Sequence, residues 1–269
     1  MKYQFADYEQ EGEVAIVRMN RYERRNSTSR EMMRDLNAAF ERFELDDSVR
    51  IAILTGVGDC FSSGADVKDP AAFEKMTEEE RKELAKERSK DRRFGVYQRL
   101  REGKILKPVI AAVNGYAIGA GAMMAWRSDL VVAAESTYFQ LREIHMGLMD
   151  AGGRTFAEFN IPFHIGLEIS LGLKITAQRA YEIGLVNKVV PDAQVIPAAK
   201  EMAKQLCELP PLAVQLTVEC ARRLVLTHLI PISTALGEYQ EVEVLMKTED
   251  SREAFRAFLE KRKPVFKGK

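Results

Sequence analysis

The stretch from 107 to 153 constrains the fold of this chain more than any other. It opens with an apolar run between Pro108 and Asn114, which is short, rich in β-branched residues and typical of a strand buried in a parallel sheet. A glycine-rich segment, 115–121, follows at once, and glycine lets backbone N–H groups approach a ligand closely. The apolar segment 122–126 is expected to form a buried helix that begins at this turn, where anions bind readily.

A second apolar strand is expected over 130–134, and the chain then reaches Glu143, a single carboxylate in a mostly apolar stretch. These elements together predict an anion-stabilising backbone turn with one acid or base beside it. The apolar run 108–126 is also about as long as a membrane span. Because it holds Asn114 and three glycines after a proline, it suits a strand, a turn and a buried helix better than a helix that faces lipid.

Charge and cysteine content exclude several classes of protein. The chain has 269 residues with 40 basic and 40 acidic side chains, so no net field attracts it to nucleic acid or to an anionic membrane. Its three cysteines lie far apart without metal-ligand spacing, and the first residues are too polar for a signal peptide. We therefore expect a cytoplasmic protein with reduced thiols.

Strands and helices alternate in the first two thirds of the chain. A strand is expected over 13–19, and the capping box Thr28–Glu31 precedes apolar residues at helical spacing. The next strand is expected over 51–55, and this alternation favours parallel βα units. From about 195 onward the pattern becomes helical almost throughout.

Four motifs, in order along almost the whole chain, resemble those of one family. The segment 107–121 resembles the signature KPxIAAVNGxAxGGG, and 64–68 resembles the turn G-A-D-x-K. The segment 20–26 resembles NRPxxxN, with Tyr22 where the family usually has proline, and 139–147 resembles the segment that carries the family's second acid. On these motifs the chain is identified as a member of the crotonase superfamily, the enoyl-CoA hydratases and isomerases.

The resemblance implies an α/β fold and a mode of assembly. It implies a crotonase-like ββα spiral core domain over 1–195 and a helical C-terminal trimerisation region over 196–269. The implied partner is an acyl-CoA thioester, with coenzyme A as part of the substrate and no separate cofactor. The implied assembly is a homotrimer or a dimer of trimers, with no nucleic acid and no membrane as partner.

The resemblance also assigns roles to residues. The backbone amides of Ala65 and Ala120 would form an oxyanion hole, Glu143 would be the acid/base, and Asp150 is a candidate second acid. His145, two residues beyond Glu143, is a further candidate for lining the pocket. Residues that would contact coenzyme A come from three parts of the chain, namely Arg24 and Arg25, then Ala65, Asp66, Val67 and Lys68, then Phe258 and Lys261. Arginine forks suit phosphate oxygens, while a solvated turn and surface packing are the structural alternatives. The charged segment 70–103 would shape the acyl pocket.

The acids that are present favour one reaction. Two positions carry glutamate in the family's hydratases, and here they are Met123 and Glu143. Hydration uses one group to activate water and another to deliver a proton, and Met123 does neither. A single carboxylate instead suits an enoyl-CoA isomerase, because it removes a proton from one carbon and returns it to another. A hydratase with Asp150 as second acid, a decarboxylase, a carbon–carbon lyase or hydrolase, and a non-catalytic CoA-ester-binding protein remain alternatives.

Overall fold

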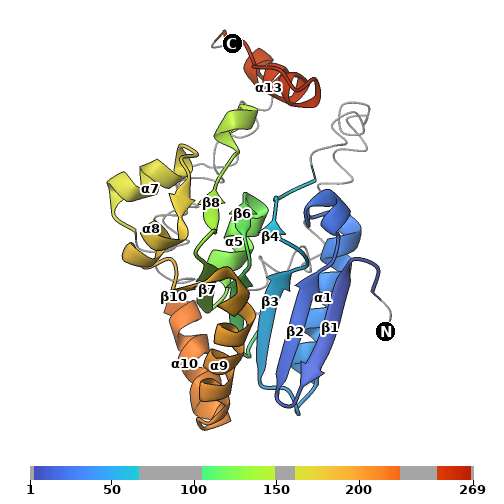
Figure 1. Ribbon diagram of the computed structural model, residues 1–269, viewed down its shortest axis with the longest axis vertical. Helices are drawn as coiled ribbons and strands as arrows, with labels where there is room; N and C mark the ends of the chain where they lie inside the picture. The colour runs from blue at the N-terminus through green and yellow to red at the C-terminus, as the bar shows by residue number, and fades with distance from the viewer. Residues whose placement is uncertain (1–2, 67–104, 149–160, 225–246, 268–269) are drawn as a thin grey trace.

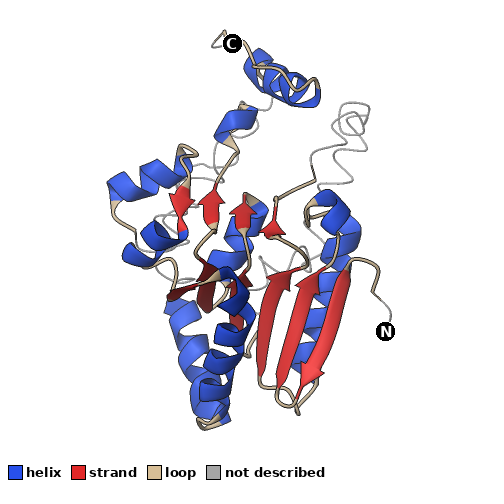
Figure 2. Ribbon diagram, in the orientation of Figure 1, coloured by secondary structure: helices blue, strands red, loops and turns tan. Residues whose placement is uncertain are grey.

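The computed structural model describes residues 3–66, 105–148, 161–224 and 247–267 (Figure 1). The roles expected for Val67, Lys68, Asp150 and the segment 70–103 concern residues outside these ranges. Within them the chain forms two β-sheets of unequal size, with helices packed on both faces of the larger one (Figures 1 and 2). No helix in these four ranges combines the length and the apolar character needed to cross a bilayer.

The larger sheet has six strands in the order β1-β2-β3-β5-β7-β10. Their bounds are Ala6–Glu11, Val14–Met19, Ile51–Gly56, Val109–Val113, Leu130–Ala134 and Lys188–Val190. Only β1 runs antiparallel to its neighbour, and the other four pairings are parallel. The strands expected from the apolar runs before Asn114 and before Glu143 are therefore confirmed as β5 and β7.

The smaller sheet has four short strands in the order β4-β6-β8-β9 (Figure 2). They span Cys60–Ser62, Tyr116–Ile118, Tyr138–Gln140 and Ile175–Thr176, and β4, β6 and β8 are parallel. Each of these three follows a strand of the larger sheet directly, so the chain passes through both sheets three times in succession. The sequence did not predict this sheet, and β6 lies inside the segment expected to be a glycine-rich turn.

The larger sheet is buried on both faces, as a parallel sheet requires. Alternate residues of each strand point to opposite faces, so that Leu54 and Ala111 belong to one apolar cluster and Ile53 and Ile110 to the other. The first face is covered by α1 (Arg30–Leu45) and α5 (Ala120–Arg127), and the second by α9 (Val195–Cys207). The helix expected after the glycine-rich turn is thus confirmed as α5.

The remaining described helices lie mostly in the second half of the chain. They are α7 (Phe163–Ser170), α8 (Ala177–Glu182), α10 (Pro211–Leu224) and α13 (Glu249–Leu259), with the 3₁₀ turns η1 (Tyr22–Arg24), η2 (Ile144–Met146) and η3 (Asp192–Gln194). The expected cap of α1 is displaced by one residue, because Ser29 accepts the hydrogen bond from Met32 N. Thr28 instead pairs with Ala65 in a β-bridge.

Lys107, the first residue of the main motif, has a structural role. Its buried Nζ donates hydrogen bonds to Phe43 O at 3.0 Å and to Asp46 O at 2.7 Å, two carbonyls at the C-terminal end of α1. The last carbonyls of a helix have no partner within the helix, and a cation there also interacts favourably with the helix dipole. Lys107 therefore joins α1 to the start of β5.

Lys107→Met is expected to lower the free energy of unfolding by about 2–3 kcal/mol, because it removes charge-assisted hydrogen bonds and leaves two carbonyls without their donor. Urea titration followed by circular dichroism measures the change. Lys188→Met, at an exposed lysine of β10, is the matched control and should shift stability by less than about 0.5 kcal/mol. Equal midpoints for the two variants would contradict the role given to Lys107.

Candidate active site

The turn after β4 has a defined direction, which follows from its pairing with Thr28. Thr28 N donates to Gly64 O at 2.8 Å, and Asp66 N donates to Thr28 O at 3.1 Å. Along an extended chain, successive backbone groups point to opposite sides. The N–H of Ala65 therefore points away from Thr28, toward the side on which β4 pairs with β6.

The turn after β6 lies in contact with the turn after β4. A Cβ atom built on Gly64 would lie 2.6 Å from Ile118 O and 3.6 Å from Ala120 N, and Gly64 has a φ of +89°. Only glycine combines this backbone conformation with so close an approach. Ala120 is the first residue of α5, so its N–H has no partner within the helix and lies at the positive end of the helix dipole.

Glu143 lies beside the same turn. It precedes η2, and its carbonyl accepts hydrogen bonds from Met146 N and Leu148 N, both at 3.0 Å. A Cβ atom on Gly119 would lie 3.4 Å from Glu143 Oε1, and Oε2 is buried. Since Gly119 N also donates to Gln140 O at 2.9 Å, the start of α5 is tied to the end of β8. The structure therefore brings together Ala65, Ala120 and Glu143, each at the C-terminal end of a strand of the smaller sheet.

Met123 lies one helical turn beyond Ala120 on α5. Its side chain is partly buried and packs against the core. It contributes a thioether where the resemblance would place a carboxylate in a hydratase. Among the described residues near the two turns, Glu143 is thus the carboxylate closest to the start of α5.

Asp66 is engaged within the protein. Its Oδ2 lies 2.6 Å from Arg21 NH1, and the two side chains are only 21% and 14% exposed. The same guanidinium donates to the carbonyl and hydroxyl oxygens of Ser27. This ion pair fixes the turn after β4 against the segment after β2, in agreement with a structural role for Asp66.

The two arginines expected near coenzyme A are exposed. Arg24 ends η1, and Arg25 forms an ion pair with Asp59 at 3.0 Å on the protein surface. Arg25 and Asn26 have φ angles of +53° and +51°, which non-glycine residues adopt rarely. The buried amide of Asn26 maintains this turn, because its Oδ1 accepts from Arg21 N and its Nδ2 donates to two carbonyls of the segment 57–60.

Asn114, in the main motif, is the counterpart of Asn26. Its Nδ2 donates to Gly56 O at 2.9 Å and Gly58 O at 2.8 Å, so the two asparagines hold the turn between β3 and β4 from opposite sides. The sequence analysis placed both asparagines in motifs but gave neither a role. For Asn114, the available signal was an amide side chain that directly follows an apolar run.

The C-terminal candidates lie on or near α13. Phe258 is 38% exposed near the end of this helix, and Lys261 lies just beyond it with an exposed side chain. α13 contacts η2, which places the C-terminal segment near Glu143. Although much of His145 is exposed, its Cε1 lies close to Gly172. Partial desolvation of the ring, followed by the charge of Arg142, lowers the pKa of His145.

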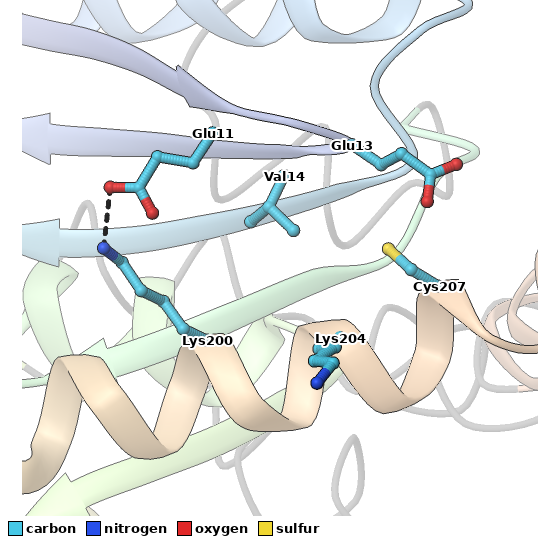
Figure 3. Close-up of a pocket in the computed structure, with 6 residues that line it drawn as sticks. All are labelled: Glu11, Glu13, Val14, Lys200, Lys204 and Cys207. Atoms are coloured by element: carbon cyan, nitrogen blue, oxygen red, sulfur yellow. Dashed lines mark hydrogen bonds and ion pairs between the residues drawn. The ribbon is translucent and has the colours of Figure 1, made fainter.

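A shallow pocket of about 250 Å³ lies elsewhere, between the β1–β2 turn and α9 (Figure 3). It is lined by Glu11, Glu13, Val14, Lys200, Lys204 and Cys207, and Glu11 forms an ion pair with Lys200 at 2.7 Å. Val14 begins β2, so this pocket lies at the N-terminal ends of the parallel strands of the larger sheet. The smaller sheet follows the C-terminal ends of those strands, and none of the motif residues lines the pocket.

Comparison with known proteins identifies the family of this chain. The family described as "Enoyl-CoA hydratase/isomerase" matches residues 9–269. An enoyl-CoA hydratase of Mycobacterium tuberculosis is 34% identical over 267 residues, which cover 97% of this chain and 96% of the relative. A 2,3-dehydroadipyl-CoA hydratase of Escherichia coli is 33% identical over 259 residues, which cover 95% of this chain and 96% of the relative.

Among solved structures, a carnitinyl-CoA hydratase from Mycobacterium avium superposes with a TM-score of 0.82 at 33% identity, and the match covers 100% of both chains. The expected α/β spiral fold is thereby confirmed. With a family match from the first strand to the last residue and a common fold over the whole length, this chain belongs to the enoyl-CoA hydratase/isomerase family of the crotonase superfamily.

Proposed function

We propose that this protein is an acyl-CoA enzyme that stabilises a thioester enolate, and that it shifts the double bond of an enoyl-CoA. The observation that carries the proposal is the position of Glu143 Oε1 against Gly119, next to the amide of Ala120. Names of the relatives support acyl-CoA thioesters as the substrate class. Coenzyme A enters as part of the substrate, and the proposal invokes no further cofactor.

The chemistry requires stabilisation of negative charge on the thioester carbonyl oxygen. The amides of Ala65 and Ala120 would donate to that oxygen, and a preorganised donor of this kind typically contributes about 3 kcal/mol to the transition state. Glu143 would then remove a proton from the α-carbon of a 3-enoyl thioester, and the C–H electrons would delocalise into a dienolate. Return of the proton to the γ-carbon gives the 2-enoyl thioester and restores the carboxylate.

Met123 favours isomerisation over hydration. Hydration requires a group that activates water in addition to one that delivers the proton. The thioether of Met123, on the first turn of α5, has no proton to give and accepts hydrogen bonds only weakly. A proton shift between two carbons of one substrate requires Glu143 alone.

A hydratase is the second candidate, because the similar relatives carry hydratase names. In that case a second acid must come from another residue, and Asp150 is the one that the sequence offers. The CoA-binding roles of Arg24, Arg25, Phe258 and Lys261 belong to the same proposal, as does assembly into a homotrimer or a dimer of trimers. Sedimentation velocity would measure the assembly.

The test is to incubate the protein separately with trans-3-hexenoyl-CoA and trans-2-hexenoyl-CoA in deuterated water, and to identify the products by mass and NMR. We expect interconversion of the two isomers with incorporation of solvent deuterium. Addition of water to the 2-enoyl thioester without a shift of the double bond would reject the isomerase and favour the hydratase. Binding without any exchange of protons would indicate a non-catalytic CoA-ester-binding protein.

A further inference from the structure

The turn that carries Glu143 is in contact with the C-terminal helix. η2 ends at Gly147, which has a left-handed φ of +68°. A Cβ atom on Gly147 would lie 2.6 Å from Ser251 Cα and 2.9 Å from Ser251 N. Ser251, in the first turn of α13, is only 2% exposed. The backbones of η2 and α13 therefore meet at a place where no side chain fits.

η2 also packs against Gly172, which lies two residues beyond the end of α7. A Cβ atom on Gly172 would lie 2.7 Å from His145 Cε1 and 2.8 Å from Ile144 Cγ2. Gln140, at the end of β8, donates to Gly172 O at 2.7 Å. The turn is thus in contact with both α13 and the segment that follows α7, two segments that are distant in sequence.

A short hydrogen-bonded path joins Gly147 to Glu143. Met146 N and Leu148 N, the residues on either side of Gly147, both donate to Glu143 O at 3.0 Å. Gly147 N donates to Ile144 O at 3.2 Å. Because these bonds close one compact turn, a displacement of Gly147 is transmitted to the backbone of Glu143 and from there to its carboxylate.

We propose that α13 positions the carboxylate of Glu143, and that the close approach of Ser251 to Gly147 is the contact through which it does so. The inference rests on the proposed function, because it requires Glu143 to be the group that moves the proton. Gly147 and Ser251 are positioning residues, since neither touches the reacting atoms. The C-terminal helix then contributes to the chemical step.

Gly147→Ala tests the contact. The added methyl group would begin 2.6 Å from Ser251 Cα, and reaching an ordinary separation requires a shift of about 1 Å. Misplacement of a reacting group by about 1 Å can reduce the rate on the order of 100-fold. We expect exchange of the α-protons of hexanoyl-CoA in deuterated water to fall by about that factor, with the Kd for hexanoyl-CoA within about threefold of the parent protein.

Gly184→Ala is the matched control. Gly184 has a similar φ of +82°, and a Cβ atom there meets nothing within 4 Å. Both variants place alanine at a similar positive φ, so Gly184→Ala measures the effect of backbone strain alone, and only Gly147→Ala, which adds the clash with Ser251, should lose exchange activity. If the two variants exchange protons equally fast, the proposal is overturned.

Ser251→Leu provides a second approach from the other partner, should Gly147→Ala fail to fold. Because Ser251 is buried, a larger side chain must displace α13 from η2, whereas Arg252→Leu alters an exposed position of the same helix. Slow exchange in the first variant only, with the Kd retained, supports the proposal, and equal rates reject it. Glu143→Gln serves as the reference variant. If Glu143→Gln remains fully active, the proposed function itself fails. If Glu143→Gln is inactive while Gly147→Ala and Ser251→Leu are active, only the positioning role is rejected.

Discussion

Glu143→Gln is expected to reduce proton exchange and isomerisation about 1,000-fold, within the range of 10²–10⁴ that a positioned acid or base typically contributes. Glutamine has nearly the shape of glutamate, but its amide does not accept and release a proton near neutral pH. The side chain of Glu143 lies against Gly119. Because glutamine fills the same space, the replacement should leave the turn and the binding of hexanoyl-CoA intact.

The measurement is the exchange rate of the hexanoyl-CoA α-protons in deuterated water, together with the rate of interconversion of the hexenoyl-CoA isomers. Glu135→Gln, at an exposed glutamate after β7, is the control and should behave as the parent protein. Full activity in Glu143→Gln would remove this residue from the mechanism and leave the family assignment in place.

Gly64→Ala is expected to reduce turnover by about 100- to 1,000-fold, the loss that typically follows removal of one oxyanion donor. The reason is geometric, because a Cβ atom at 64 would lie 2.6 Å from Ile118 O and must separate the two turns that carry Ala65 and Ala120. Backbone strain at the φ of +89° adds a loss of stability of about 1–2 kcal/mol.

Gly12→Ala separates the two effects of Gly64→Ala, namely the backbone strain and the clash between the two turns. Gly12 also has a positive φ, +58°, but a Cβ atom there meets nothing within 4 Å. The comparison requires kcat for trans-3-hexenoyl-CoA and the thermal midpoint of both variants. Gly12→Ala should show only the loss of stability that backbone strain causes, so a large difference in kcat between folded samples of the two variants supports the oxyanion hole. Similar kcat values would mean that the contact between the turns has no part in catalysis.

The central strands of the larger sheet were predictable from sequence, whereas β1 and the smaller sheet were not. The runs that became β5 and β7 are continuous, apolar and bounded by turn residues, which is the signal of a strand buried on both faces. The strands β4, β6 and β8 have three residues each, too few to show alternation. β6 is also flanked by glycines, so that the local composition indicated a turn where the structure has a strand.

The site was predictable in its components but not in its contacts. Small residues indicated both turns, and Glu143 was distinguished as a single carboxylate in a mostly apolar stretch. The direction of the Ala65 amide depends on a bridge to Thr28, which the sequence pattern had placed in a helix cap. The ion pair of Arg21 with Asp66 and the approach of Ser251 to Gly147 join segments that no local pattern relates.

The three residues of the candidate site, Ala65, Ala120 and Glu143, follow the ends of three adjacent strands, β4, β6 and β8. Neighbouring strands are about 4.8 Å apart, a spacing imposed by main-chain hydrogen bonds whatever the side chains are. In the proposed mechanism, the peptide backbone would therefore set the separation between the thioester carbonyl oxygen and the carboxylate of Glu143. A carnitinyl-CoA hydratase with only 33% identity superposes over its whole length with a TM-score of 0.82, so the fold that sets this spacing tolerates the exchange of most side chains.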